Sequence, residues 1–218
     1  MTNGPNSKPH LGGSVTPPSN GDAILFSGPA DRNKAPLLTV LQALLPTQGS
    51  VLEIASGTGQ HVEWFASHCP QITWHPSDPA ADCRASVNAR VAVAQLPNVV
   101  SAIDLDVLGN WPELVAEGVC VANMLHISPP ETLPALVEGV AGVLVTGGFL
   151  LVYGPFKQNG QFTSKGNAAF DESLKSRDAR WGIRDVEQLI ATAEEYGLGY
   201  EQTIAMPANN MSVILRRA

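Results

Sequence analysis

Apolar and polar positions along the chain alternate between strand-like runs and helix-like stripes. Leucines over 35–45 recur at helical spacing between Pro36 and Pro46, and strongly apolar runs begin near residues 51, 72, 99, 118 and 147. Helices are expected between these runs, over about 60–68 and 82–95, and again from Ser128, where a serine, two prolines and Glu131 are typical of a helix start. This alternation predicts a mostly parallel sheet with helices on both faces.

The end of the chain departs from this alternation. After an expected helix over 185–196, two strand-like segments at 200–206 and 211–217 are separated by only four residues, PANN. Such a short connection predicts an antiparallel hairpin, because a parallel return needs a crossover of roughly a dozen residues or more. Residues 155–183 are too long for a simple connection and predict an insertion over the strand ends. We expect residues 1–22 to form a flexible tail, with 23–218 as a single domain.

The stretch VLEIASGTGQH at 51–61 carries the clearest chemical signal. An apolar strand leads into a glycine-rich turn and then a helix, which is typical of a site for a nucleotide-bearing cofactor. Gly57 and Gly59 remove side chains where the backbone must approach a ligand, and Glu53 is expected to place a fixed negative charge beneath the turn. Val62 stands where a dinucleotide fingerprint needs its third glycine, so a cofactor other than NAD or FAD is favoured.

Composition narrows the classes of partner. The net charge is −7, and the 13 Lys and Arg residues are scattered, which disfavours nucleic acid and anionic membranes. Cys69, Cys83 and Cys120 include no C-x-x-C pair, so buried reduced thiols are expected rather than disulfides or a zinc site. No apolar run reaches the roughly 18 residues that span a bilayer, and we expect a cytoplasmic protein. The oligomeric state is left open.

Several features together resemble a class I S-adenosylmethionine-dependent methyltransferase. These are the glycine pair after the first strand, Asp78 ending the second, Asp106 after the third, and the closing hairpin. Spaced blocks more narrowly resemble the poorly characterised methyltransferase-like 26 family, from about residue 24 to the C-terminus: RNKAPLL (32–38), LEIASGTGQH (52–61), WHPSD (74–78), LDV (105–107), NMLHISP (123–129), YGPFKQNG (153–160) and WGIRD (181–185). The resemblance implies a Rossmann-like α/β fold with a seven-stranded, mostly parallel sheet, S-adenosylmethionine as cofactor, and methyl transfer. It implies no acceptor.

Two acids are candidates for binding the adenosine part of this cofactor. Asp78 lies 19 residues after Gly59 at a predicted strand end, where a carboxylate can accept hydrogen bonds from both ribose hydroxyls. The alternative is a cap of the local Ser77-Asp78-Pro79 turn. Asp106, within the family-like LDV string, is expected to accept from the adenine amino group in preference to Asp104.

Three further residues are candidates for the methionine end. Glu53 is expected to order the glycine turn and face this end, or else to make a structural hydrogen bond to turn amides. Arg32 can pair its planar guanidinium with the cofactor carboxylate if the N-terminal helix closes as a lid, and otherwise begins a solvated helix. Asn123 ends the fourth strand, where a carbonyl can accept from the cofactor amino group.

Candidates for the acceptor side follow the same strand ends. His126 is the best placed general base, or alternatively a histidine that satisfies local backbone, and Tyr153 lines the acceptor pocket or packs its ring. Phe156, Phe162, Phe170 and Trp181 of the insertion are expected to wall an apolar pocket, or to form a satellite core. His61, His68 and His75 recur every seven residues but span a helix and a strand, so no metal site is predicted.

The acidic balance and the aromatic insertion favour a small, partly apolar acceptor molecule. Two other functions remain open from the sequence. One is a nicotinamide-dependent oxidoreductase, and the other is a non-catalytic module that binds the cofactor to regulate a partner.

Overall fold

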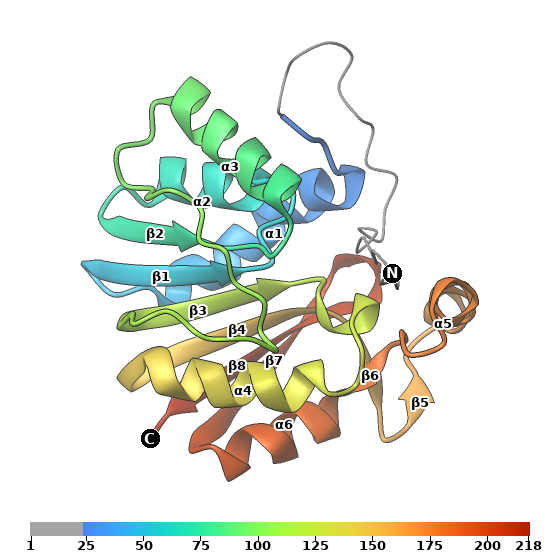
Figure 1. The fold of residues 1–218 in the computed structure, drawn as a ribbon. Coiled ribbons are helices and arrows are strands. Elements are labelled where there is room, and N and C mark those ends of the chain that lie inside the picture. Colours follow the sequence, from blue (N-terminus) through green and yellow to red (C-terminus); the bar gives the residue numbers. More distant parts are fainter. Residues whose placement is uncertain (1–23) are drawn as a thin grey trace, which may run out of the picture.

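A computed structural model describes residues 24–218, so the tail expected at 1–22 lies outside the described residues. The strands form one sheet in the order β2 (Ile72–Pro76), β1 (Gly49–Ile54), β3 (Ala116–Ala122), β4 (Leu144–Gln158), β8 (Asn210–Arg217) and β7 (Leu198–Met206) (Figure 1). The pairs from β2 to β4 are parallel, whereas β4, β8 and β7 pair antiparallel. The predicted parallel sheet with a closing antiparallel hairpin is therefore confirmed.

The apolar run at 99–104 is less regular than predicted. It contributes two isolated parallel bridges to the edge beside β2, Trp74 with Val99 and Ser77 with Ile103. The sheet has eight strands rather than the expected seven, because β5 (Gln161–Phe162) and β6 (Arg184–Asp185) pair with the outer end of β4. These bridges hold residues 99–103 along the edge of the sheet, where a further parallel strand would lie. They also fix the start of the loop that carries Asp104 and Asp106.

Helices cover both faces of the sheet. The helices α1 (Gly28–Leu44), α2 (Gln60–His68) and α3 (Ala81–Ala94) lie on one face, with α4 (Thr132–Val143) and α6 (Val186–Glu195) on the other (Figure 1). Alternate strand residues fill the two cores: Leu150 and Val152 of β4 join the α4 and α6 side, whereas Phe149 and Leu151 join the α1 to α3 side. A sheet buried on both faces explains why β4 reads as almost wholly apolar.

The first helix begins earlier than predicted. It starts at Gly28 rather than near Ala35, with Ser27 as its N-cap, and Pro36 lies inside the helix instead of at its entry. The Ser27 hydroxyl accepts from the Ala30 N–H at 3.4 Å, and a proline also occupies the first turn. Arg32 therefore lies within the helix, not in a segment before it.

The region after β3 also differs from the prediction. The strand expected over 118–127 ends at Ala122, and Leu125–Ile127 forms the short 3-10 helix η1. The helix expected from Ser128 begins at Thr132, because the Ser128 hydroxyl donates to the Leu125 carbonyl at 3.0 Å instead of capping a helix. Leaving the strand early turns residues 123–126 across the end of the sheet.

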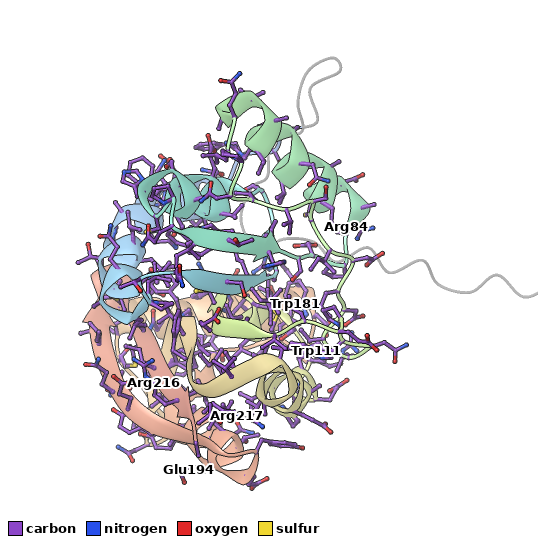
Figure 2. All side chains as sticks on the ribbon, turned by 90° about the vertical axis from the view of Figure 1, so that its left-hand side faces the viewer. Arg84, Trp111, Trp181, Glu194, Arg216 and Arg217 are labelled. Atoms are coloured by element: carbon purple, nitrogen blue, oxygen red, sulfur yellow. The ribbon has the colours of Figure 1, made fainter. Side chains whose placement is uncertain are left out.

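The segment 155–183 contains the end of β4, then β5, and the helix α5 (Lys165–Arg177). It lies on the side toward which β1 to β3 point, as the predicted insertion requires (Figure 1). Figure 2 shows Arg84 of α3 well apart from Arg216 and Arg217 of β8. Because β8 is antiparallel to β4 and ends at Arg217, these two arginines lie at the opposite edge, where the parallel strands begin. The carboxyl ends of the parallel strands and the insertion therefore share one edge.

The three cysteines are free and buried, as predicted. Between residues 24 and 218, no helix combines the length and apolarity needed to cross a bilayer.

Candidate functional site

The glycine turn joins β1 to α2 in a conformation that suits glycine. Gly57 has a φ of 56° and Gly59 a φ of 82°, both in the left-handed region. A Cβ at Gly59 would lie 2.9 Å from the Val87 Cα in α3. The Gly59 N–H donates to the Ser56 carbonyl at 3.0 Å and closes the turn. Gly59 is therefore packed directly against the backbone of α3.

Asp78 braces this turn from the end of β2. Its Oδ2 accepts from the Gly57 N–H and its Oδ1 from the Ala80 N–H, each at 2.9 Å. Asp78 thus caps its local turn, but as a buried side chain rather than at the surface, and the ribose role stays a prediction. Burial raises the pKa of the Asp78 carboxyl, and the two amide donors oppose that rise. Each oxygen of a carboxylate has two lone pairs, so one on each is left for a ligand hydroxyl.

Glu53 differs from its prediction. It lies on β1 opposite Cys120 of β3, and it is 3% exposed. Burial raises the pKa of its carboxyl to about 8; a hydrogen bond with Ser56 opposes the rise and the charge of Asp78 adds to it. The expected fixed negative charge is therefore wrong, because such a group is protonated near pH 7. The expected bond to turn amides is absent too: Glu53 Oε2 is buried with no hydrogen-bond partner among residues 24–218.

A cavity of about 540 Å³ opens at the carboxyl ends of the strands. Its walls come from the first turns of α1, the glycine turn, the ends of β3 and β4, α5, and the β7–β8 connection. Five of the predicted site residues line it: Arg32, Gly57, Asn123, His126 and Tyr153. The lining does not include Glu53, Gly59, Asp78 or Asp106. The structure thus brings together the residues expected at the methionine and acceptor ends.

Asp106 lies apart from the cavity. Its side chain is exposed, and its Oδ1 accepts from the Leu108 N–H at 3.0 Å in a local turn. Asp104, also exposed, pairs with Arg84 at 3.0 Å. Ile103, just before them, accepts from the Asp78 N–H at 3.1 Å, which places this loop beside the end of β2.

His126 lies in η1 and faces the cavity. Burial, with smaller contributions from the charges of Arg177 and Arg184, lowers the pKa of its imidazole to about 4, so the ring is neutral at pH 7. The ring meets Phe170 of α5 edge to face, with 5.4 Å between centroids. The His126 carbonyl accepts from the Gly182 N–H at 3.0 Å and so anchors the insertion. The backbone of His126, rather than its side chain, therefore holds the insertion in place. Among residues 24–218, the His126 ring has no hydrogen-bond partner.

Tyr153 lies within the buried part of β4 and faces α1. Burial raises the pKa of its hydroxyl, and the neighbouring carboxamides of Asn33 and Asn210 oppose the rise. A phenol whose pKa lies above 10 stays protonated at neutral pH, so Tyr153 acts as a hydrogen-bond donor rather than as a base. The Tyr153 carbonyl accepts from the Asn123 N–H at 2.8 Å, which joins the two strand ends.

His61 is a cavity residue that the sequence did not single out. Its Nε2 lies 2.6 Å from Asn33 Oδ1, which links α2 to α1 across the cavity wall. Burial lowers the pKa of His61 to about 4, with a smaller contribution from Lys34. From the sequence, His61 was considered only as part of a metal site with His68 and His75. Its position just after the glycine turn is the signal that could have placed it at the cavity. Among residues 24–218 no cluster of His, Cys, Asp and Glu suits a metal ion.

Arg90 of α3 is a second residue that the sequence did not reveal. Its guanidinium donates to the Thr58 carbonyl at 2.8 Å, to the Leu25 carbonyl at 2.6 Å, and to Glu63 at 2.8 Å. The segment before α1 is thereby tied to the glycine turn. The Ser27 N–H, at the start of α1, adds a bond to Gln60 Oε1 at 2.6 Å. These contacts fix the first turns of α1 at the cavity wall.

The predicted aromatic wall is mostly wrong. Phe156 is buried in the α4 and α6 core, Phe162 is partly exposed, and Trp181 lies under Arg177 at 5.4 Å. Only Phe170 of these four lines the cavity. The reason is that β4 continues to Gln158 and carries Phe156 into the main core.

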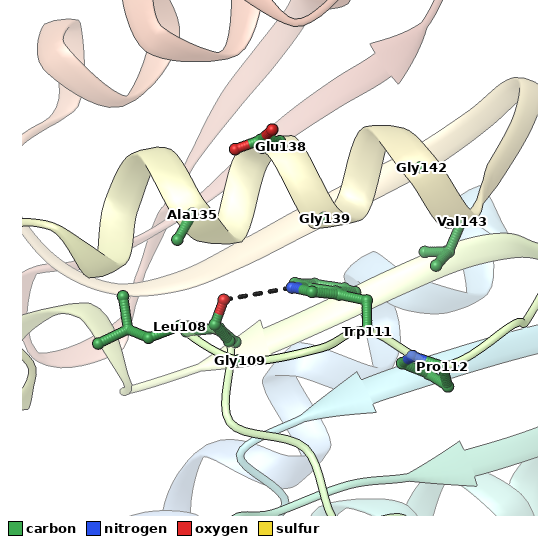
Figure 3. Close-up of a pocket in the computed structure, with 10 residues that line it drawn as sticks. Leu108, Gly109, Trp111, Pro112, Ala135, Glu138, Gly139, Gly142 and Val143 are labelled. Atoms are coloured by element: carbon green, nitrogen blue, oxygen red, sulfur yellow. Dashed lines mark hydrogen bonds between the residues drawn. The ribbon is translucent and has the colours of Figure 1, made fainter.

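A second cavity, of about 420 Å³, lies between residues 107–112 and α4 (Figure 3). The Trp111 ring packs beneath Gly139, where a Cβ would overlap the ring, and its Nε1–H donates to the Val107 carbonyl at 3.2 Å. None of the predicted site residues lines this cavity.

Solved structures share the fold. An O-methyltransferase family protein from Burkholderia thailandensis matches with a TM-score of 0.74 and 17% identity, over 87% of this chain and 58% of that one. CalO1, a methyltransferase in calicheamicin biosynthesis, solved in its SAH-bound form, matches with a TM-score of 0.70 and 17% identity, over 88% of this chain and 56% of that one. Human N-acetylserotonin methyltransferase, in complex with SAM, matches with a TM-score of 0.71 and 14% identity, over 85% of this chain and 52% of that one. The chain spans little more than half the length of these proteins.

The architecture is therefore the Rossmann-like methyltransferase fold predicted from the sequence. The family comparison covers almost all of the described residues, since the matching family model spans 25–217. That model does not bear on the narrower resemblance to the methyltransferase-like 26 family. The chain belongs to the family described as "Protein of unknown function (DUF938)".

Proposed function

We propose that this chain is an S-adenosylmethionine-dependent methyltransferase that acts on a small-molecule acceptor. The observation that carries the proposal is that the glycine turn, braced by Asp78, lines a cavity of about 540 Å³ at the carboxyl ends of parallel strands. Open α/β sheets bind ligands at this edge, and pockets of roughly 300–1,000 Å³ suit small molecules. The structural neighbours whose descriptions include SAH or SAM share this fold.

The residues present fit the adenosine part of this cofactor. Each Asp78 oxygen has one backbone donor and a remaining lone pair for a ribose hydroxyl. Asp106, beside the end of β2, is proposed to accept from the adenine amino group through its second oxygen. Gly57 and Gly59 let the backbone approach without side chains. Val62 is buried in the core, so the third glycine that a pyrophosphate site uses is replaced by a packing residue.

The residues of the cavity fit the methionine end. Arg32 of α1 is proposed to pair with the cofactor carboxylate, and Asn123, at a φ of 59°, to offer a carbonyl to its amino group. Glu53 beneath the turn has a buried oxygen without a described partner, which suits a donor from this end of the ligand. The narrower resemblance to the methyltransferase-like 26 family, which rests on the sequence blocks, is retained as part of the proposal.

The bound cofactor would supply an activated methyl group, so the protein has to position the acceptor and exclude water. Tyr153 donates a hydrogen bond that orients the acceptor. His126, neutral at pH 7, takes a proton from acceptors that must lose one. Arg90 and the His61–Asn33 contact keep α1 closed over the site.

Isothermal titration calorimetry with S-adenosylhomocysteine tests the proposal, with NADH as the comparison ligand. We expect saturable binding of S-adenosylhomocysteine near one molecule per chain and none of NADH. A folded protein that binds only NADH would support a nicotinamide-dependent oxidoreductase instead. Methyl-labelled cofactor, incubated with a metabolite extract and followed by mass spectrometry, then separates an enzyme from a regulatory module that binds without turnover.

A further inference from the structure

The charge of the cavity lining restricts its second ligand. Among the described residues that line the cavity there is no Asp or Glu, and Arg32 is the one Arg or Lys. His61 and His126 also line it, and burial lowers the pKa of both to about 4, so neither is charged at neutral pH. Besides the cofactor amino group assigned to the Asn123 carbonyl, a second protonated amine, on the acceptor, would lose its hydration without gaining a carboxylate partner. A carboxylate acceptor would have to share Arg32 with the cofactor.

Carboxamide side chains in the cavity lining can accept hydrogen bonds from a ligand. Asn167 of α5 uses both amide hydrogens, on Thr163 Oγ1 at 2.9 Å and on the Asn209 carbonyl at 3.1 Å. Asn210 donates to the Pro207 carbonyl at 3.1 Å. Asn167 therefore turns both donors to the protein and leaves its oxygen to accept, whereas Asn210 uses one amide hydrogen on the protein and lies against the Tyr153 hydroxyl. A hydroxyl or N–H of the ligand satisfies such oxygens.

The rest of the acceptor side is apolar and includes an aromatic ring. Phe170 stands edge-on to His126, and Ile127, Pro155 and Pro207 complete this part of the lining. Rigid apolar groups of this kind pack well against a flat ring. Tyr153, His126 and the carboxamide oxygens stand at the same part of the lining as polar groups for a ring substituent.

We propose that the acceptor is an uncharged aromatic molecule bearing a hydroxyl group, and that the methyl group goes to its oxygen. This inference rests on the proposed function. The acceptor oxygen forms a bond to the methyl carbon as the carbon–sulfur bond of the sulfonium breaks. The electron pair of that bond passes to sulfur and gives a neutral thioether. The hydroxyl proton passes to the His126 imidazole and from there to solvent.

Three ring compounds of similar size test the acceptor class: catechol, which is uncharged at pH 7, protonated benzylamine, and benzoate. Each is titrated into protein saturated with S-adenosylhomocysteine, and each is incubated with methyl-labelled S-adenosylmethionine. We expect catechol to bind at least about tenfold more tightly than the other two and to give a labelled ether. Equal or stronger binding of benzylamine or benzoate overturns the inference. So does the failure of all three to bind while S-adenosylhomocysteine binds.

A charge substitution at the wall gives a second, independent readout. Asn210→Asp puts a carboxylate of nearly the same shape into the lining, and we expect it to raise benzylamine affinity about tenfold or more relative to catechol. Asn159→Asp, in the exposed turn between β4 and β5, is the matched control and leaves the ratio unchanged. An unchanged ratio in Asn210→Asp contradicts the placement of the acceptor. If the parent protein does not bind S-adenosylhomocysteine at all, the proposed function itself is overturned.

Discussion

Glu53→Gln is expected to stabilise the protein, by an amount that depends on pH. The Glu53 carboxyl has a pKa of about 8 in the folded chain and an ordinary value of 4.5. Between these values the folded state keeps a proton that the unfolded state has lost, so stability falls as pH rises, by about 1.36 kcal/mol per pH unit. The 2.5 pH units between 4.5 and 7 therefore correspond to about 3 kcal/mol. Glutamine resembles the protonated acid but has no proton to lose, so it escapes this penalty.

The assay is urea unfolding of the parent and Glu53→Gln from pH 5 to pH 8. We expect the two stabilities to be close at pH 5 and to diverge by about 3 kcal/mol by pH 7, in favour of glutamine. Glu194→Gln, an exposed position on α6, controls for the general effect of removing one negative charge. A difference between parent and Glu53→Gln that does not change with pH would refute the conclusion that burial keeps this carboxyl protonated.

Three further substitutions test the turn and its supports. Gly59→Ala should destabilise the chain by about 1–3 kcal/mol more than Gly160→Ala in urea unfolding, because both glycines have positive φ but only the first would place a Cβ 2.9 Å from Val87; equal losses would show that the close packing is unimportant. Arg90→Lys keeps the charge but cannot reach all three acceptors, so calorimetry should give about tenfold weaker S-adenosylhomocysteine binding, and unchanged affinity would remove Arg90 from the site. Asp78→Asn should also weaken binding at least about tenfold, because it removes a charged acceptor, and binding at parent strength would exclude the ribose role.

The sequence was most informative where local pattern and fold agree. The spacing of apolar residues predicted α2 and α3 closely, and the short connection at 207–210 predicted the antiparallel hairpin of β7 and β8. The parallel pairing of β2, β1, β3 and β4 was predicted from the same alternation, because a helix between two strands is typical of a parallel crossover. These features are determined by residues close together in the sequence, and for that reason the sequence alone predicts them.

Tertiary contacts decided the features that the sequence did not give. Pro36 looked like the start of a helix, but a cap at Ser27 and packing of α1 on the sheet carry the helix through it. The charge of Glu53 depends on how deeply β1 is buried, which composition cannot report. Arg90 looked like an ordinary helical arginine, and only folding brings it to Leu25 and Thr58.

The candidate site was predicted in part for the same reason. Residues directly after strands, such as Asn123 and His126, were found because parallel strands end at one edge. His61 and Asn33 come from different helices, and their contact at 2.6 Å has no signature in spacing. The exposure of Asp106 likewise follows from the irregular pairing of residues 99–104 with β2.

Hydrogen–deuterium exchange with and without S-adenosylhomocysteine tests the central claim most directly, because it locates the ligand on the chain. We predict that the ligand slows exchange at the glycine turn 56–60, around Asp78, at residues 123–126, and in the first turns of α1. The second cavity, between residues 107–112 and α4, should exchange as before. Protection confined to that second cavity, or no protection at a saturating ligand concentration, would contradict the account.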